Sequence, residues 1–315
     1  MSRCLTIGMI QMSISRDAEE NFRRIERGVD VLMRRSPRPE LIVGVEGGIG
    51  YGVREKIPGA ATDRFGGMAR RYGVYLVPGT MFEIGSGCPA GKFYNSAPVF
   101  GPNGELIDVY RKMAPWYPAE YRTQPGNRYV VFEIAEKGVK VGLLLCYDLN
   151  FPEISRNLAL MGAEVLLKLT EDFEEAYRMN RPVHLARAIE NQAFLVSSNA
   201  VGQADGYSMY GHSMAVDPSG RILLEAGNRD ALLSVTIDAD EALSARKYGT
   251  AFQDHYLGQL KKYHFPMPYS ANISSAPLYQ ELKDSPDRPS DFQKDLLMDH
   301  VGNPRTPGKG GNELG

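Results

Sequence analysis

Cys146 is the residue of this chain best placed to act as a nucleophile. It follows the apolar segment 139–145, which is typical of a buried strand, and precedes Pro152, which can occupy the first turn of a helix. A thiol at the end of a strand lies beside the amides that open the next turn, and these favour the thiolate and can bind an oxyanion. Cys146 is therefore a candidate nucleophile, with a small apolar core residue as the alternative interpretation.

Glu46 and Lys112 lie at comparable places and supply the other groups that thiol chemistry needs. Glu46 follows the apolar segment 41–45 and leads into a glycine-rich loop, GGIGYG. Lys112 follows a predicted hairpin and precedes segment 113–121, whose prolines exclude regular helix and central strand. A thiol that attacks a carbonyl or nitrile carbon needs a base and a group that binds the oxyanion. Glutamate can be the base and lysine the cation, although a solvated loop carboxylate is the plainer alternative for Glu46.

Cysteine chemistry that uses a histidine base is the competing interpretation. The histidines of the chain are His184, His212, His255, His264 and His300. None of them lies in a recognisable catalytic signature, and a single histidine is more often a structural hydrogen-bonding group. From residue types and spacing alone, a glutamate base and a histidine base for Cys146 both stay open.

Strand-like and helix-like segments alternate in both halves of the chain. They do so over residues 5–76 and again over 141–199, and hairpins lie between and after these stretches. This pattern predicts an α/β protein with two mixed sheets and helices outside them. Helices are expected at 18–33, 62–72, 152–161 and 182–189, the last opened by Pro182. A loop is expected at 170–178, which is acidic and carries no clear periodicity.

The composition excludes several classes of protein. The 315 residues carry 36 basic and 38 acidic side chains, a formal net charge of −2, which gives no electrostatic case for binding nucleic acid or an anionic membrane. The three cysteines are far apart and lack metal-site spacing, so a disulfide framework or a zinc site is not expected. Nowhere do 18 apolar residues run together, and we predict a cytoplasmic protein without a membrane span.

The chain changes character near its carboxyl end. Residues 1–262 are predicted to form one domain, and 263–315 an extended tail rich in proline, serine, glycine and charge. The tail nevertheless carries apolar residues: Phe265, Met267, Tyr269, Leu278, Tyr279, Leu282, Phe292, Leu296 and Leu297. We expect part of it to dock on a neighbouring subunit, and hence a homo-oligomer, a dimer or an assembly of dimers.

Three segments in register resemble the nitrilase, or carbon-nitrogen hydrolase, superfamily. They are LIVGVEG around Glu46, VYRKMAPW around Lys112 and LLLCYDLNFPEISRNLALMGAEVLL around Cys146. The later segments NAVG and GHSMAVDPSGRIL are also similar. The resemblance extends in order over about residues 4–240, and three separate signatures are far more specific than any one of them.

The resemblance implies a fold, a triad and a mechanism. The implied fold is a four-layer α-β-β-α sandwich of two mixed sheets with helices on both outer faces, and the implied triad is Glu46, Lys112 and Cys146. In the implied mechanism, Glu46 deprotonates Cys146, which attacks an amide carbonyl. Lys112 and the Tyr147 N–H then stabilise the oxyanion, ammonia leaves, and water hydrolyses the thioester. Neither a metal nor an organic cofactor is implied.

The segment RKMAPWYPAE resembles the aliphatic amidase and formamidase branch, in which a second glutamate enters the site. That residue would be Glu120. We expect the substrate to be bound by Tyr51, Trp116, Tyr147 and Glu171. Two stretches depart from the family pattern: Val45 stands where proline usually precedes the base, and segment 168–173, KLTEDF, differs from the expected pocket wall.

The leading hypothesis is a cysteine amidase that hydrolyses small aliphatic amides to a carboxylic acid and ammonia. A nitrilase and an N-carbamoyl amide hydrolase, which would use the same triad, are the alternatives. A binding protein that keeps the fold without catalysis is a third hypothesis. The presence of Glu46, Lys112 and Cys146 together argues against it, because a silent descendant has no chemical need for all three.

Overall fold

The computed structural model describes residues 3–85, 87–116, 119–204, 207–250, 256–266 and 272–281. The chain divides into a first unit, Met1–Pro115 with Arg122–Pro266, and a second unit, Trp116–Tyr121 with Met267–Gly315. The helices are α1 Ala18–Met33, α2 Ala60–Tyr72, α3 Pro152–Leu160, α4 Tyr177–Asn191, α5 Asp240–Tyr248, α6 Tyr256–Leu260 and α7 Pro277–Glu281, with 3-10 turns η1 Cys146–Asn150, η2 Glu174–Ala176 and η3 Ile273–Ser275.

The strands all belong to the first unit. They are β1 Cys4–Gln11, β2 Leu41–Glu55, β3 Tyr75–Glu83, β4 Tyr94–Phe100, β5 Leu106–Arg111, β6 Val131–Ile134, β7 Val139–Leu145, β8 Val165–Thr170, β9 Phe194–Asn199, β10 Val201–Ala204, β11 Tyr207–Tyr210, β12 Met214–Val216, β13 Ile222–Glu225 and β14 Ala231–Asp238. Within the described ranges they form two six-stranded sheets, in the orders β14-β1-β2-β3-β4-β5 and β13-β12-β9-β8-β7-β6, and a β10-β11 hairpin.

Both large sheets are mixed. In the first, β1, β2 and β3 are parallel, while β14, β4 and β5 run antiparallel to their neighbours. In the second, β7, β8 and β9 are parallel, and β6, β12 and β13 are antiparallel. Parallel strands need crossover connections, which the helices α1, α2, α3 and α4 supply. The carboxyl ends of the parallel strands in each sheet therefore lie at the same end of that sheet.

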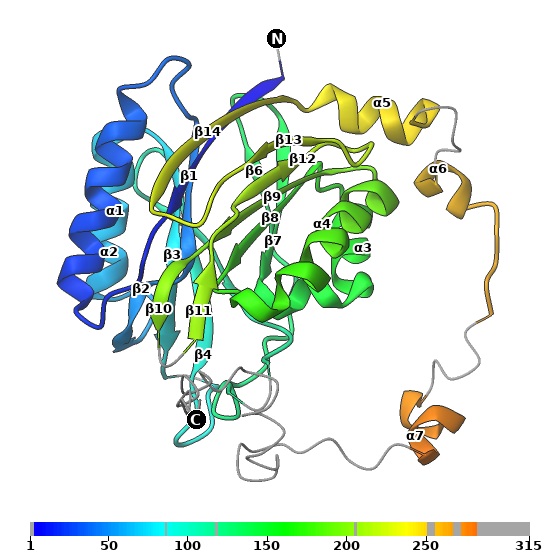
Figure 1. Ribbon diagram of the computed structural model, residues 1–315, viewed down its shortest axis with the longest axis horizontal. Coiled ribbons are helices and arrows are strands. Elements are labelled where there is room, and N and C mark those ends of the chain that lie inside the picture. Colours follow the sequence, from blue (N-terminus) through cyan, green and yellow to red (C-terminus); the bar gives the residue numbers. More distant parts are fainter. Residues whose placement is uncertain are drawn as a thin grey trace, which may run out of the picture. The chain divides into compact units, whose positions relative to one another are not determined.

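The two sheets pack face to face, with α1 and α2 outside the first and α3 and α4 outside the second (Figure 1). Side chains such as Leu41 and Val141 form the apolar core between the sheets. A second apolar cluster, which includes Ile25, joins α1 and α2 to the first sheet, and a third, which includes Leu158, joins α3 and α4 to the second. The predicted four-layer α-β-β-α sandwich is confirmed.

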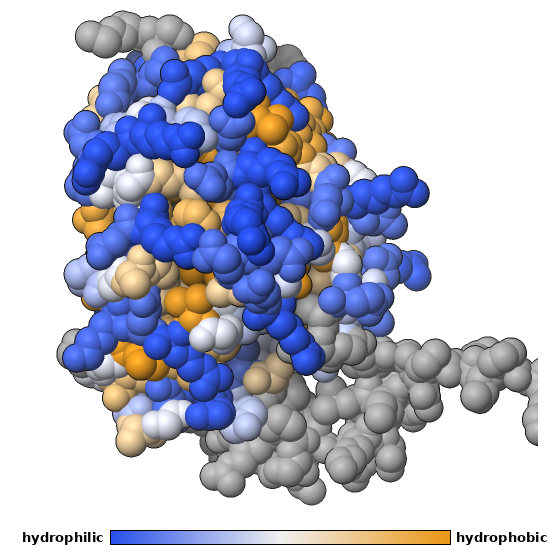
Figure 2. Space-filling view, turned by 90° about the vertical axis from the view of Figure 1, so that its left-hand side faces the viewer, coloured by the Kyte–Doolittle hydropathy of each residue, from blue (hydrophilic) through white to orange (hydrophobic). Residues whose placement is uncertain are grey.

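Helix α1 shows how the local sequence determines where an outer helix begins and which of its faces is buried. Asp17 caps it by accepting a 2.9 Å hydrogen bond from the Glu19 backbone N–H, and Ile25, Val29 and Leu32 are fully buried on its inner face. The surface on the side of α1 and α2 is mostly hydrophilic, with hydrophobic residues scattered over it (Figure 2). These helices therefore present one apolar face to the sheet and a polar face outward.

Strand β2 is longer than the sequence predicts. The expected strand ended at residue 45 before a glycine-rich loop, whereas β2 continues to Glu55. Gly47 and Gly50 have φ angles of +68° and +122°, and the pairing with β3 shifts register on both sides of Gly50. Glycine accepts these angles without strain, so the strand bends through irregular positions and resumes pairing. Glu46 consequently lies within a bent strand.

Segment 170–178 also differs from the expected loop. It contains the end of β8, the turn η2 and the first residues of α4, and Pro182 lies inside that helix. A proline in a helix interior removes one backbone hydrogen bond. Among the residues that the structure describes, no helix is both long and apolar enough to cross a membrane. Most of the tail expected to dock on a neighbour lies outside the described residues, and its role and the boundary at 262 stay predictions.

Candidate active site

Cys146 stands at the carboxyl end of β7, where the strand turns into η1. Its side chain is partly exposed and its φ is +46°, in the left-handed region that residues other than glycine rarely adopt. Such a conformation costs about 1–3 kcal/mol and persists only where the surroundings hold it. Asp148 supplies that hold: it accepts hydrogen bonds from the Leu145 and Ala114 backbone N–H groups and from the Tyr110 hydroxyl, at 2.9, 2.7 and 2.7 Å.

Asp148 is completely buried beneath the turn. Burial raises the pKa of its carboxyl group to about 6, although the hydrogen bond from Tyr110 and the charge of Lys112 act in the opposite direction. Because three donors converge on this carboxylate, its main effect is to fix the shape of the turn that carries Cys146.

Glu46 and Lys112 form a buried ion pair. The Lys112 Nζ lies 2.9 Å from Glu46 Oε1, and the two residues are 1% and 4% exposed. The Asn95 amide donates to the same oxygen at 2.8 Å, and the Glu171 backbone N–H donates to Glu46 Oε2 at 3.1 Å. The glutamate comes from β2 and the lysine from the residue after β5, so the first sheet supplies both members of the pair.

The charges of this pair reach Cys146. Burial raises the pKa of the Cys146 thiol well above its usual value, and the Glu46 carboxylate raises it further, while Lys112 acts in the opposite direction. The resting nucleophile is therefore a thiol and needs a base as it attacks. The carboxylate whose charge bears most strongly on this thiol is that of Glu46.

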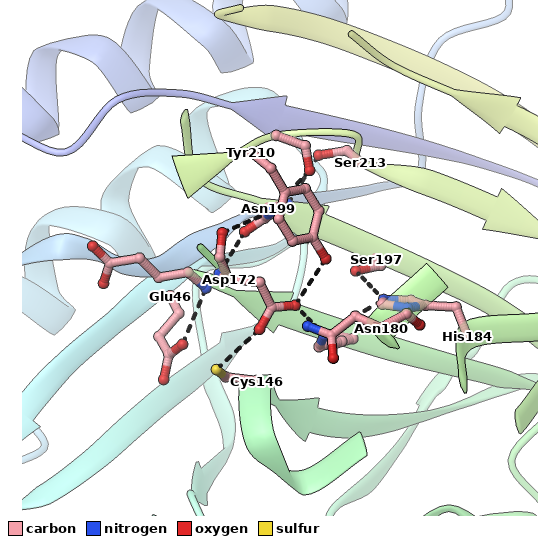
Figure 3. Close-up of polar contacts among 12 residues, drawn as sticks. Glu46, Cys146, Asp172, Asn180, His184, Ser197, Asn199, Tyr210 and Ser213 are labelled. Atoms are coloured by element: carbon pink, nitrogen blue, oxygen red, sulfur yellow. Dashed lines mark hydrogen bonds and ion pairs between the residues drawn. The ribbon is translucent and has the colours of Figure 1, made fainter. Parts of the chain in front are cut away.

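A second carboxylate, Asp172, contacts the nucleophile directly. Its Oδ1 lies 3.4 Å from Cys146 Sγ, and its Oδ2 accepts from the Tyr210 hydroxyl at 3.1 Å (Figure 3). The same Oδ2 accepts from Lys168 Nζ at 2.6 Å. The Asp172 backbone N–H donates to Asn199 Oδ1 at 2.9 Å. Burial disfavours ionisation of Asp172, but the charge and hydrogen bond of Lys168 outweigh it and lower the pKa to about 2. Asp172 is therefore a fixed anion.

His184 completes this second cluster from α4. Its Nε2 lies 3.1 Å from Ser197 Oγ, and its Nδ1 lies 2.7 Å from the Asn180 carbonyl oxygen (Figure 3). The same Nε2 lies 3.4 Å from Lys168 Nζ. Burial and the charge of Lys168 lower the pKa of His184 to about 3, so the ring is neutral. His184 contacts Lys168 and is held by structural hydrogen bonds, as the plainer interpretation of the histidines expected.

The predicted substrate-binding residues have different surroundings. The Tyr51 ring lies over Gly47, the residue after Glu46, and packs on Phe82 with ring centroids 5.4 Å apart. Tyr147 packs edge-on against Phe151 at 5.3 Å, and Glu171 reaches Glu46 through its backbone. Within the second unit, the Trp116 backbone N–H donates to Glu120 Oε2 at 2.6 Å. The substrate contacts of these residues, and the role of Glu120 in catalysis, stay predictions.

Residues 6–247 match the carbon-nitrogen hydrolase family. The chain belongs to this family. An (R)-stereoselective amidase from Pseudomonas sp is 41% identical over 158 residues, which make up 50% of this chain and 57% of that protein. The omega-amidase NIT2 of Homo sapiens is 30% identical over 228 residues, 66% of this chain and 79% of that protein. The match to the first of these relatives thus spans little more than half of its length.

Solved structures of carbon-nitrogen hydrolases share the fold. Nit3 of Saccharomyces cerevisiae, a member of the nitrilase superfamily, superposes with a TM-score of 0.71 at 24% identity and covers 80% of this chain and 96% of its own. An amidase from Nesterenkonia sp. AN1 gives a TM-score of 0.67 at 25% identity and covers 78% and 94%. The resemblance to the nitrilase superfamily is confirmed.

In this carbon-nitrogen hydrolase, sequence reasoning missed Lys168, Asp172, Tyr210 and the contact of Asn95 with Glu46. The departure of segment 168–173 from the family pattern was the signal that could have located the first two, because a lysine inside an apolar strand needs a partner. Tyr210 carried no local signal. Among the described residues, no group of three or more histidine, cysteine or acidic side chains is arranged to hold a metal ion.

Proposed function

We propose that this carbon-nitrogen hydrolase is a cysteine-dependent amidase that converts small aliphatic amides to carboxylic acid and ammonia through a thioester. The observation that carries the proposal is the buried Glu46–Lys112 pair, whose two charges both act on the thiol of Cys146. A base, a cation and a nucleophile are the groups that acyl transfer to a thiol requires.

The first half of the reaction forms the thioester. Because the pKa of Cys146 is raised, its proton passes to Glu46 as Sγ attacks the amide carbon. The carbonyl oxygen becomes an oxyanion that Lys112 Nζ and the Tyr147 backbone N–H stabilise. Protonated Glu46 then gives its proton to the amide nitrogen, the C–N bond breaks, and ammonia leaves.

The second half hydrolyses the thioester. Glu46, again a carboxylate, takes a proton from water, and the resulting hydroxide attacks the acyl carbon. The carboxylic acid leaves as the C–S bond breaks, and Glu46 returns the proton to Cys146. Asn95 and the Glu171 N–H hold both oxygens of Glu46, so the base keeps one position through both steps.

The relatives support this reaction class. Both sequence relatives described above are named amidases. The Nesterenkonia structure is a glutamate-to-glutamine mutant that shows covalent addition of the acetamide moiety of fluoroacetamide at its active-site cysteine. A nitrilase and an N-carbamoyl amide hydrolase remain alternative functions with the same three residues, and their products distinguish them: the first consumes nitrile, and the second releases carbon dioxide with ammonia.

The test is ammonia release from acetamide, propionamide, propionitrile and N-carbamoylalanine. We expect release from the two amides, and we expect Cys146→Ala to lower it on the order of 10⁶-fold, the cost of losing a nucleophile in a serine hydrolase. Cys88→Ala is the matched control, since Cys88 is also a partly exposed free thiol. Turnover of the nitrile or the carbamoyl compound alone would favour an alternative. No turnover of any substrate would favour the binding-protein hypothesis.

A further inference from the structure

Asp172 has one oxygen held in place and one oxygen directed at the nucleophile. Lys168 and Tyr210 both bind Oδ2, whereas Oδ1 faces Cys146 Sγ at 3.4 Å. The carboxylate cannot turn easily, because Lys168 and Tyr210 hold Oδ2 from two elements, while Asn199 fixes the backbone of Asp172. In the resting enzyme, the thiol proton can point to Oδ1. Once Sγ carries an acyl group, that proton is gone and Oδ1 faces the acyl group instead.

A buried carboxylate beside the nucleophile is unfavourable for stability, so its presence calls for a functional reason. Burying a charge is unfavourable, and an apolar pair of similar volume is often as stable as a buried ion pair. The Asp172 carboxylate also raises the pKa of the Cys146 thiol, which does not help to form the nucleophile. A purely structural pair would not need to direct an oxygen at Sγ.

We propose that Asp172 is a specificity residue that binds a protonated amino group on the α-carbon of the substrate, so that the preferred substrates are α-amino amides. The proposal rests on the amidase function proposed above. The α-carbon is bonded to the acyl carbon that Sγ attacks, so a nitrogen on the α-carbon lies close to Sγ. An acceptor that already contacts Sγ is therefore within reach of that nitrogen.

The two buried lysines would act on different groups of such a substrate: Lys112 on the carbonyl oxygen, and Lys168, through Asp172, on the α-ammonium group. Lys112 pairs with Glu46 from the first sheet and, in the mechanism proposed above, binds the carbonyl oxygen. Lys168 binds the far oxygen of Asp172, so it orients the carboxylate while leaving Oδ1 toward the substrate. An α-ammonium group at Oδ1 forms a charge-assisted hydrogen bond, which a methyl or a hydrogen in its place does not.

The experiment compares kcat/KM for alaninamide and for isobutyramide, in which a methyl group replaces the ammonium. Assays at about pH 7 keep an α-amino group with a pKa of about 8 mostly protonated. We expect the wild-type enzyme to prefer alaninamide, and Asp172→Asn to reduce this preference by roughly 10- to 100-fold, the size of one hydrogen bond to a charged group. Both enantiomers of alaninamide are tested.

Two further variants keep the result interpretable. Asp217→Asn removes another buried carboxylate that pairs with a cation four residues away, and it should leave the preference unchanged. Lys168→Met with Asp172→Asn removes both charges, so it avoids an unpaired buried lysine if Asp172→Asn alone does not fold, and it should lose the preference.

The outcomes separate this inference from the function on which it rests. Equal kcat/KM of the wild-type enzyme for both amides, or a preference that survives the loss of Asp172, would overturn the specificity inference and leave the amidase function intact. Failure of the wild-type enzyme to release ammonia from either amide or from propionamide would overturn both.

Discussion

The site contains two buried ion pairs of the same chemical type, one from each sheet. Lys112 and Glu46 are 66 positions apart in sequence and meet at 2.9 Å across the first sheet. Lys168 and Asp172 are four positions apart at the end of β8 and meet at 2.6 Å. Both pairs act on Cys146, yet the partners of their carboxylates differ.

The two carboxylates differ in their hydrogen-bond partners and in their ability to accept a proton. Both oxygens of Glu46 are hydrogen-bonded to groups that hold it near the thiol, as a base must be. Asp172 is held as a permanent anion by Lys168, with its pKa lowered to about 2, and is poorly suited to accept a proton. In our two proposals, similar pairs therefore serve different ends: proton transfer by Glu46 in the first sheet and substrate recognition by Asp172 in the second.

The largest expected effect is the loss of activity when Glu46 of the first pair is replaced. Glu46→Gln should lower kcat/KM for propionamide by about 10²- to 10⁴-fold, the usual contribution of a general base. The measurement is steady-state ammonia release. Glu83→Gln is the control, because Glu83 is a buried glutamate that pairs with Arg111 at 2.5 Å and lies outside the proposed triad. Equal losses in the two variants would contradict a catalytic role for Glu46.

Removing one member of the second pair should show mainly as lost stability. Lys168→Met leaves the Asp172 charge buried without its partner, and we expect a loss of about 3–5 kcal/mol in the free energy of unfolding. Urea denaturation measures it. Adding Asp172→Asn should restore most of the stability because no unpaired charge remains. If the double variant were as unstable as the single one, packing of the lysine stem and not its charge would explain the loss.

His184, which contacts Lys168 of the second pair, should make folding stability depend on pH. Its pKa is about 3 in the folded chain and about 6.5 when unfolded, so between these values the unfolded chain binds an extra proton. Its contribution to stability is present above about pH 6.5 and is lost as pH falls toward 3. We expect about 2 kcal/mol to be lost between pH 7 and pH 5. His184→Gln should remove that part of the slope in urea titrations at the two pH values, and an unchanged slope would contradict it.

The smallest effect concerns the hydroxyl that supports Asp172. Tyr210→Phe removes a 3.1 Å hydrogen bond to Oδ2 and should lower the free energy of unfolding by about 1 kcal/mol. Thermal unfolding measures this difference. Because Lys168 still binds the same oxygen, the preference for alaninamide over isobutyramide should fall less than in Asp172→Asn. A fall as large as in that variant would show that Tyr210, and not Lys168, orients the carboxylate.

Local patterns predicted most of the fold because they act over short distances. Apolar runs and helical periodicity located β7, α1 and the order of strands and helices, and their alternation predicted two mixed sheets with helices outside them, while the four-layer arrangement was implied by the family resemblance. The patterns failed where glycine or proline, which usually interrupt regular structure, lie inside a strand or a helix. Glycines at positive φ let β2 continue to Glu55, and α4 includes Pro182.

The sequence by itself determined the family and pointed to Glu46, Lys112 and Cys146 as the expected triad, because each lies in a signature that can be read in one stretch of chain. Only the tertiary structure decided which carboxylate contacts the thiol. Asp172 Oδ1 is directed at Sγ by Lys168 from β8, Tyr210 from β11 and Asn199 from β9. No local pattern encodes that convergence, since it forms only when β7, β8 and β9 pair in the second sheet and the β10-β11 hairpin folds beside them.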